Sequence, residues 1–418
     1  MKYTRGTISL NETKKYRIIL TVFLYVFKNY LRKGDDMNYT ICTDFPKEML
    51  LKPEGPCLSI YMPTHRLKMD HKQDIIVFKN LAKEAKLSLE QKYTDRDIKP
   101  LLKLLKDMEE EVDLWNYSLD GLALFATLDE MIIYRLEKEF QPISIVSDSF
   151  HIKPMVEFYQ AIETFQILAL EAESFALYQG NHLDIKPMVL SEEVETTLKE
   201  VLGSQHTEDY QTHGVYGGAS DGSTFHGHGG RSDEVEIDRA KFFKHVDRFV
   251  LEQVSKQAKL PLILVTQKEH HADFRNLSNN PYLLEERIEG SFNDFKENEI
   301  KMELKDINDQ RFDLLINQDK EHYHNLRNKG LSSDQFIDVL KAVLASRVET
   351  LFIEKNKIIP GQIDFNTQQI IQSDLDDPKT DDLLDDLVQH AYQTGTKVYI
   401  LDKDKMPTES GVAAVFRY

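Results

Sequence analysis

The first 120 residues after position 36 show apolar and polar patterns typical of an α/β domain. The run "CLSIYM" is apolar throughout and ends at a proline, so it is typical of a buried strand. Apolar residues three and four apart indicate helices, and two short apolar runs around a polar turn indicate a hairpin. In order, the pattern predicts a strand at 57–62, helices at 75–92 and 100–115, a hairpin at 121–137 and an extended segment at 140–156. Residues 37–156 are therefore the predicted N-terminal α/β domain.

A second block, predicted as a middle domain at 157–297, begins with strands and continues through a glycine-rich stretch. Three strands are predicted from Phe165 to about Leu190. Residues 203–232 are poor in large apolar side chains and contain many glycines. An amphipathic helix is predicted at about 234–257, because Asp233 and Glu236 resemble a capping box. Its apolar stripe consists of Ile237, Phe242, Val246, Phe249, Val250 and Val254, and a buried strand follows at 260–266.

The third block, 305–418, alternates helical and strand patterns. Alternation of this kind predicts a small three-layer α/β domain with a largely parallel sheet. The acidic run at 376–386 is interpreted as a solvated helix face. The elements expected are charged helical sequence at 305–328, helices at 333–345 and 381–394, and strands at 348–354, 397–402 and 411–418.

Composition narrows the protein class without naming a function. The chain has 418 residues, 41% of them hydrophobic, and a mean hydropathy of −0.45, as expected of several globular domains. Its 52 Lys/Arg against 70 Asp/Glu give a net charge of −18, which excludes nucleic-acid binding through general basicity. Two cysteines cannot build a disulfide framework or a four-thiolate zinc site, so a cytoplasmic location is expected.

The first 36 residues differ from the rest in charge. They carry eight Lys/Arg against three Asp/Glu, and the apolar run at 18–27 is too short to span a bilayer. No small-residue cleavage site follows that run. We therefore expect residues 1–36 to be an upstream extension of the reading frame, with Met37 as the biological start, rather than a membrane anchor.

Three sequence motifs match known chemistry only in part. "GASDG" at 218–222 has the form of a nucleophile elbow but lacks the flanking strand and helix. "GHGGRS" lacks the lysine of a phosphate-binding loop. His206, His213, His226 and His228 are close in sequence, but nothing fixes them in a metal-binding geometry. No metal and no cofactor are expected.

The segment "YMPTHR" at 61–66 places Thr64, His65 and Arg66 directly after a predicted strand. A simple interpretation is a capped turn, in which Pro63 ends the strand and Thr64 bonds to the backbone. The alternative is an anion site in which His65 and Arg66 contact RNA phosphate. Both interpretations remain open at the level of sequence.

Several of these landmarks together resemble the bacterial archaeo-eukaryotic release-factor-like proteins, relatives of the archaeo-eukaryotic translation release factors and Pelota. "HGHGGRS" at 226–232 resembles the Gly-Gly-Gln loop of that family, and "CLSIYMPTHR", "VETLFIE" and "GVAAVFRY" occur in the matching order. The resemblance covers about 40–418. It implies a mixed α/β, multidomain protein with an RNase-H-like middle domain and a C-terminal domain of the Pelota and kink-turn-binding ribosomal protein type.

The resemblance also implies site residues and partners. Gly229 and Gly230 match the two glycines that approach the ester at the tRNA 3′ end, while Arg231 stands where the family has Gln. If the site is catalytic, its residues are Gly229, Gly230 and Arg231. If it binds RNA, the candidates are His226, His228 and Arg231, together with His65 and Arg66. The implied partner is the ribosome with its rRNA and tRNA, a translational GTPase is a further candidate, and no membrane is involved.

Three functions follow from this resemblance and from the composition. The first is a cytoplasmic, ribosome-associated factor that acts in rescue, recycling or hibernation through the A site. The second is a peptidyl-tRNA ester hydrolase in which Arg231 replaces the motif Gln. The third is a non-ribosomal scaffold whose acidic surface binds a basic protein.

Overall fold

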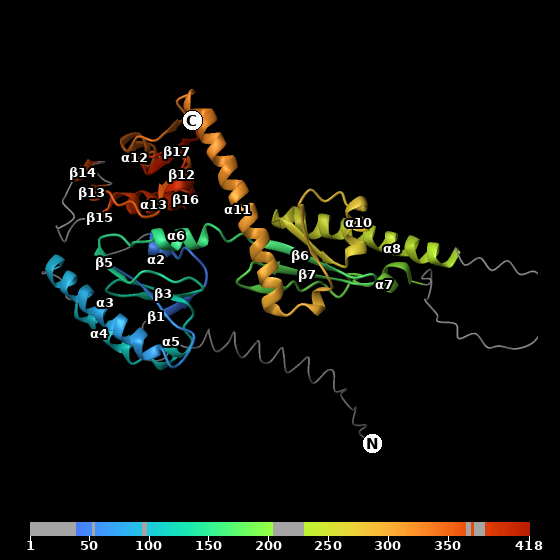
Figure 1. Cartoon of the computed structure of the whole chain (residues 1–418), viewed down its shortest axis with the longest axis horizontal. Coiled ribbons are helices and arrows are strands. Elements are labelled where there is room, and N and C mark those ends of the chain that lie inside the picture. The colour runs from blue at the N-terminus through green and yellow to red at the C-terminus, as the bar shows by residue number, and fades with distance from the viewer. Residues whose placement is uncertain (1–38, 52–54, 94–97, 204–229, 365–368, 372–380) are drawn as a thin grey trace, which may run out of the picture. The chain divides into compact units, whose positions relative to one another are not determined.

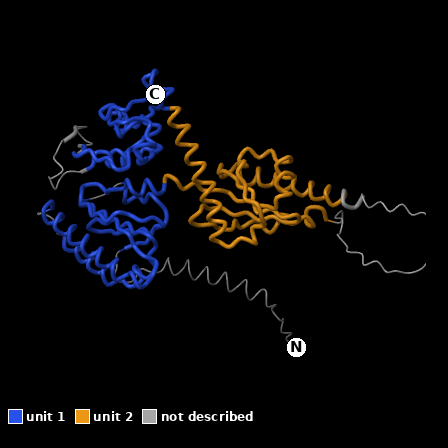
Figure 2. The backbone as a smooth tube through the Cα atoms, in the orientation of Figure 1, with its two compact units in different colours: residues 1–159, 323–418 blue, residues 160–322 orange. Residues whose placement is uncertain are grey.

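The chain folds into two compact units in this computed structural model (Figure 2). The structure describes residues 39–418 apart from 52–54, 94–97, 204–229, 365–368 and 372–380. Unit 1 contains the described residues up to Tyr159 together with Tyr323–Tyr418, and unit 2 contains Gln160–His322. The predicted extension at 1–36 lies outside the described residues.

The N-terminal part of unit 1 is built on a five-stranded sheet with the order β1-β4-β3-β2-β5 (Figure 1). β1 and β4 pair in parallel, and the other neighbours pair antiparallel. The predicted buried strand and hairpin are confirmed. The strands are β1 (Tyr39–Cys42), β2 (Cys57–Pro63), β3 (Gly121–Ala126), β4 (Met131–Leu136) and β5 (Ile143–Ser147).

The central strands of this sheet are buried on both faces. Leu58 and Leu124 belong to one hydrophobic cluster, whereas Tyr61 and Phe125 belong to another. Successive side chains of a strand point to opposite faces, so a strand covered on both sides appears in the sequence as a continuous apolar run. This explains the composition of "CLSIYM" and "GLALFA".

The helices α3, α4 and α5 pack on one face of the sheet. The ring of Phe78 on α3 lies 5.5 Å from that of Trp115 on α5. The segment predicted as extended at 140–156 instead contains β5 and the start of a helix. The helices of this part are α2 (Glu48–Leu51), α3 (His71–Lys92), α4 (Lys99–Glu109), α5 (Val112–Asn116) and α6 (Lys153–Tyr159).

The C-terminal part of unit 1 contributes to the other cluster of that sheet, since Leu387 and Val388 share it with Phe125 and Phe150. Its main sheet has the order β11-β17-β12-β16, and a small second sheet has the order β14-β13-β15. The elements are β11 (Ser332–Ser333), α12 (Phe336–Leu344), β12 (Val348–Glu354), β13 (Pro360–Asp364), β14 (Gln369–Ile371), β15 (Asp381–Asp382), α13 (Leu383–Gln393), β16 (Lys397–Leu401), a 3₁₀ turn (Lys403–Lys405) and β17 (Val412–Phe416).

The prediction of a largely parallel sheet in this part is wrong. In the described residues of this part, β12 and β16 pair in parallel, while β17 is antiparallel to both β12 and β11. A parallel pair needs a crossover connection of a dozen or more residues. The link from β16 to β17 is shorter and contains only the 3₁₀ turn, so β17 returns in the opposite direction.

Unit 2 has a mixed sheet with the order β10-β9-β6-β7-β8. β9 is parallel to β6 and β10, and the hairpin β6–β7–β8 is antiparallel. The three predicted early strands and the strand at 260–266 are confirmed. The strands are β6 (Phe165–Leu170), β7 (Phe175–Gly180), β8 (Ile185–Pro187), β9 (Leu262–Thr266) and β10 (Leu283–Glu289).

Helices pack against both faces of the unit 2 sheet. Phe242 and Phe274 belong to the cluster with Leu168 and Leu264, whereas Leu304 belongs to the cluster with Ile167 and others on the opposite face. The helices are α7 (Leu198–Leu202), α8 (Gly230–Phe249), a π-helical turn (Val250–Ser255), α9 (Lys256–Ala258), α10 (Lys268–Leu277), a 3₁₀ turn (Phe292–Asp294) and α11 (Glu297–Arg327).

Candidate functional site

The glycine-rich segment leads directly into α8. Gly230 and Arg231 stand in the first turn of α8, so the helix begins before the predicted cap at Asp233. Acidic residues favour the whole first turn of a helix as well as its cap, which is why the pattern located the start only to within a turn. His226, His228 and Gly229 lie outside the described residues, as does the candidate elbow around Ser220.

The body of α8 is fixed to unit 2 by packing and by a carboxylate. Phe242, Phe243 and Val246 are fully buried, and the ring of Phe243 lies 5.9 Å from that of Phe274 on α10. Asp247 accepts hydrogen bonds from the Ser278 hydroxyl at 2.5 Å and from the Asn279 backbone N–H at 3.1 Å. The helix that carries Arg231 is therefore held rigidly from its middle onward.

One residue of the predicted apolar stripe of α8 is not in the core. Ile237 is 54% exposed, while Val246, Val250 and Val254 are buried as expected. At 100° per residue, Ile237 lies on the side of the helix opposite Val246. The remaining stripe residues pack as predicted, Phe249 only partly buried.

After β2, Thr64 bonds to the backbone as predicted, but to residues beside the start of β3 and not within a local turn. The Thr64 hydroxyl donates to the carbonyl of Leu119 at 2.8 Å, and the Thr64 backbone N–H donates to the carbonyl of Asp120 at 3.0 Å. These bonds fix the backbone on which His65 and Arg66 stand. The capped-turn interpretation accounts for Thr64 and leaves the two basic side chains to be placed.

His65 is held by a buried carboxylate. Asp74 in the first turn of α3 accepts the His65 backbone N–H at 3.0 Å and lies 2.6 Å from its Nδ1. The hydrogen bond to Asp74 raises the pKa of His65 above its ordinary value. Because Asp74 binds Nδ1, Nε2 is the ring nitrogen that Asp74 does not engage. The His65 side chain is half-exposed.

Arg66 is paired in a fork geometry. Its Nε and Nη2 donate to the two carboxylate oxygens of Asp120, each at 2.7 Å, and Glu137 lies 3.7 Å away. The hydrogen bond from Arg66 lowers the pKa of Asp120 below its ordinary value. The structure thus places His65 and Arg66 side by side, each beside a carboxylate that balances its charge.

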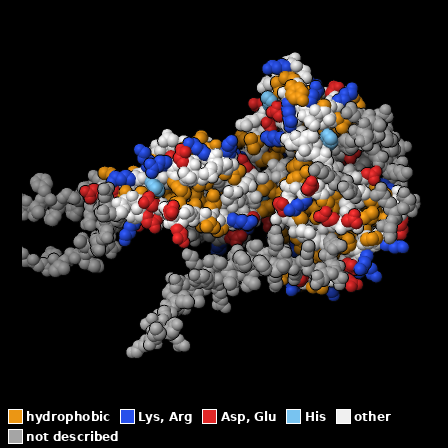
Figure 3. Space-filling model, turned by 180° about the vertical axis from the view of Figure 1, so that it is seen from behind, with side chains coloured by type: hydrophobic (Ala, Val, Ile, Leu, Met, Phe, Trp, Pro, Cys, Tyr) orange, Lys and Arg blue, Asp and Glu red, His pale blue; other side chains and the backbone are white. Residues whose placement is uncertain are grey.

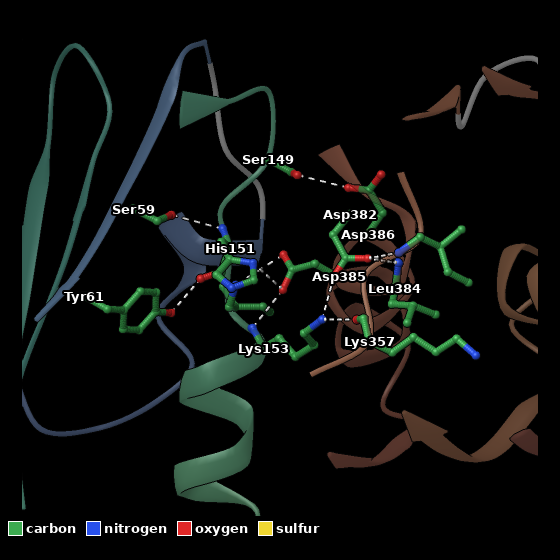
Figure 4. A network of polar contacts seen from close by, with 12 residues as sticks. Ser59, Tyr61, Ser149, His151, Lys153, Lys357, Asp382, Leu384, Asp385 and Asp386 are labelled. Carbon is green, nitrogen blue, oxygen red and sulfur yellow. Dashed lines mark hydrogen bonds and ion pairs between the residues drawn. The ribbon is translucent and has the colours of Figure 1, made fainter. Parts of the chain in front are cut away.

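A buried polar network joins the segment 149–153 to the start of α13 (Figure 4). Asp385 accepts the backbone N–H groups of Ile152 and Lys153, at 3.3 and 2.8 Å. Lys153 Nζ lies 2.5 Å from Asp382 and 3.0 Å from the carbonyl of Lys357. The Ser149 hydroxyl donates to Asp386 at 3.0 Å. Three carboxylates from adjacent turns therefore bind one short segment of the N-terminal part.

This network corrects the interpretation of the acidic run at 376–386 as a solvated helix face for residues 382–386, while residues 376–380 lie outside the described part of the chain. Asp382, Asp385 and Asp386 are 8, 1 and 5% exposed. The helix is covered on more than one side, since residues 383–389 are buried without interruption. Sequence reasoning missed the network because its basic partners, His151 and Lys153, lie far away in the chain and no local pattern links them.

Among the described residues, no group of three or more His, Cys, Asp or Glu side chains has an arrangement that would hold a metal ion. In the same part of the chain, no helix combines the length and the apolar character needed to cross a bilayer.

One family model matches the middle of the chain. Residues 163–310 match the model of bacterial archaeo-eukaryotic release factor family 6. The predicted resemblance to the bacterial release-factor-like proteins is confirmed over these residues. They include β6 to β10, the glycine-rich segment and α8. No curated protein sequence matches the chain.

Solved structures give further matches at low identity. An archaeal translation termination factor, aRF1, is 15% identical, with 87% of this chain and 92% of that chain covered and a TM-score of 0.23. Dom34 of S. cerevisiae is 10% identical, with 67% and 75% covered and a TM-score of 0.30. Archaeoglobus fulgidus Pelota is 10% identical, with 71% and 79% covered and a TM-score of 0.31. All three TM-scores are below 0.5, so the resemblance to the release-factor family rests on the match at 163–310.

Proposed function

We propose that this chain, whose residues 163–310 match a family of bacterial release factors, is a ribosome-associated translation factor. It acts in rescue, recycling or hibernation of ribosomes through the A site, in the cytoplasm, with rRNA and tRNA as its contacts. The observation that carries the proposal is the position of the glycine-rich segment. It lies inside the matched region and ends at the first turn of α8, where the family motif would stand.

The residues at this position suit contact with RNA. Glycines at 229 and 230 allow a backbone to approach a ligand closely, because they carry no Cβ. Arg231 offers a planar cation that binds phosphate through paired hydrogen bonds or stacks on a base. His226 and His228 flank the glycines and add donors. We assign Arg231 as the main RNA contact of the segment, and His65 and Arg66 as a second contact on unit 1.

Ester hydrolysis is the second candidate, favoured by the two retained glycines. In a hydrolase, a backbone N–H next to Gly230 would stabilise the developing oxyanion, an effect of about 3–4 kcal/mol per donor. Arg231 retains that backbone N–H. It lacks the side-chain amide of the family Gln, however, and this departure makes binding the function better supported by the residues.

The test uses Arg231→Ala and Arg231→Gln in the full chain, with Arg287→Ala on β10 as the control. Arg287 is half-exposed and pairs with Glu289 in the same unit. Co-sedimentation with ribosomes is measured across a salt series, and ester cleavage is measured on a defined peptidyl-tRNA. A phosphate contact of Arg231 predicts an affinity reduced by roughly tenfold to a hundredfold in the Ala variant and a salt slope smaller by about one.

Each alternative gives a different result in these assays. If the wild-type protein is a hydrolase whose Arg231 side chain is catalytic, it cleaves peptidyl-tRNA, and Arg231→Ala abolishes cleavage while leaving binding nearly intact. Arg231→Gln restores the family triplet, so it shows weak cleavage if only the amide is missing. A scaffold for a basic protein shows no salt-dependent binding to ribosomes, and that outcome removes the proposed function.

A further inference from the structure

One face of α8 is basic although unit 2 is strongly acidic. Residues 160–322 contain 17 Lys/Arg against 31 Asp/Glu. Figure 3 shows basic and acidic side chains interspersed over the face of the molecule that it draws. On α8 from Ile237 onward, in contrast, the exposed face carries Ile237, Lys241, Lys244 and Arg248, whereas Glu234 and Glu236 are exposed in the turn before it. At 100° per residue these four fall within one narrow stripe opposite the buried residues.

The two acidic residues between Ile237 and Arg248 are buried and therefore reduce the positive charge of this stripe only in part. Asp238 and Asp247 are each 6% exposed, and Asp247 is bound by Ser278 and Asn279. Asp238 accepts a hydrogen bond from Lys241 at 2.9 Å, and this pair offsets part of the positive charge of Lys241. From Ile237 to Arg248, every exposed ionisable side chain of α8 is basic.

The dimensions and chemistry of the stripe fit a phosphate backbone. Lys241 and Arg248 are seven residues apart, or about 10 Å along the helix axis, with Lys244 between them. Three exposed cations in a row track the charges of a nucleic-acid strand, whereas a compact anion would engage one or two of them. The exposed Ile237 adds an apolar surface on the side nearer the start of the helix.

We infer that Lys241, Lys244 and Arg248 form a phosphate-binding stripe along which RNA bound at the start of α8 lays its backbone. The inference rests on the proposed function, because the same helix carries Arg231 in its first turn. It adds the class of contact, which is sequence-independent binding of RNA phosphates. The stripe sits on a helix anchored by its buried face, so the three cations are presented on a rigid support.

The experiment replaces all three with Gln (Lys241→Gln, Lys244→Gln and Arg248→Gln) in the full chain. The control variant removes the same charge from exposed lysines of unit 1, with Lys72→Gln, Lys83→Gln and Lys103→Gln. Binding to ribosomes and to an RNA duplex of about 20 base pairs and arbitrary sequence is measured between about 50 and 200 mM salt. Circular dichroism establishes that each variant keeps its helices.

We expect the α8 variant to bind both RNAs with a salt slope smaller by about two to three, one for each phosphate that is no longer neutralised. Over the fourfold salt range, that slope difference corresponds to a roughly 16- to 64-fold difference in how far affinity falls. The control variant is expected to keep the wild-type slope. Equal slopes for the α8 variant and the control overturn the inference.

The two probes separate this inference from the proposed function. If the wild type binds ribosomes and the α8 variant binds them equally well, the phosphate-binding role of the stripe is refuted and the proposed function is not. Wild-type binding to the duplex alone, abolished in the α8 variant, supports the stripe and removes the ribosomal function. Absence of binding to either RNA at about 50 mM salt removes both.

Discussion

His151 Nδ1 lies 3.2 Å from Asp385 Oδ1 and joins the two parts of unit 1. The backbone of His151 is fixed as well, since its N–H donates to the Ser59 hydroxyl at 3.0 Å and its carbonyl accepts from Tyr61 at 2.6 Å. Asp385 is almost completely buried. A charge in such a place depends on its partners, and the first two predictions test that dependence.

We expect Asp385→Ala to lower the free energy of unfolding of unit 1 by about 3–5 kcal/mol, as is usual when one partner of a buried ion pair is removed. The change leaves His151 and two backbone N–H groups without their acceptor. Trp115 is the single tryptophan of the chain and is buried in unit 1, so its fluorescence during urea unfolding reports this unit. Asp404→Ala, at an exposed position, is the control. A decrease below about 1 kcal/mol would mean that the pair is not stabilising.

We expect the same pair to make unit 1 less stable at alkaline pH. Burial lowers the pKa of His151, but the charge of Asp385 and its hydrogen bond outweigh burial and leave that pKa above its ordinary value. A raised pKa in the folded state stabilises the fold fully below the unfolded pKa of about 6.5 and loses that contribution as pH rises through the folded pKa. We expect the urea midpoint to fall from about pH 6 upward in the wild type. It should fall less in His151→Gln, with the exposed His324→Gln as the control. Parallel profiles in all three proteins would contradict the assignment.

Unit 1 and unit 2 should differ when they are expressed as fragments. A fragment of residues 160–322 has both of its hydrophobic clusters within itself and is expected to unfold cooperatively. A fragment of residues 323–418 would lack Lys153, whose backbone N–H and Nζ bind Asp385 and Asp382 at the start of α13. We expect that fragment to lack a cooperative transition and to gain one when residues 37–159 are added. Cooperative unfolding of 323–418 alone would show that its core is sufficient.

Asp120 should limit the contact of Arg66 with RNA. Both carboxylate oxygens of Asp120 are bound by the guanidinium, so a phosphate has to compete with them. We expect Asp120→Asn to increase ribosome affinity several-fold at low salt and to steepen the salt dependence. Asp129→Asn, at an exposed position of unit 1, removes the same charge elsewhere and is the control. Equal effects of the two variants would exclude a specific role for Arg66.

The sequence predicted those elements whose signals are local. The strand at 57–62 and the core stripe of α8 follow from side-chain period and from breakers such as Pro63, and the structure has them. The direction of β17 did not follow, because strand pairing depends on the length of a connection and on partners distant in the chain. The burial of Asp385 was missed for the same reason, because no local sequence pattern indicates that His151 is its partner.

The sequence could predict which residue types belong to the candidate site, but not the partners that fix their side chains. Arg66 and His65 were identified as basic residues after a strand, but their carboxylate partners Asp120 and Asp74 come from other elements. Ile237 fitted an apolar stripe by spacing and proved to be exposed. A helical period gives the angle of a side chain around its axis, and only the packed neighbours decide which angles are covered.

The discontinuity of unit 1 sets an order of events during synthesis. Residues 160–322 leave the ribosome as a complete unit. The N-terminal part, in contrast, completes the cluster around Phe125 only after α13 and β17 have been made. At roughly 5–20 residues per second, the interval between Tyr159 and Phe416 lasts about 10–50 s. During that time the sheet face that carries Tyr61 and Phe125 lacks the C-terminal members of its hydrophobic cluster, such as Leu387. We therefore expect nascent chains of this protein to be most prone to aggregation while the second unit is being made.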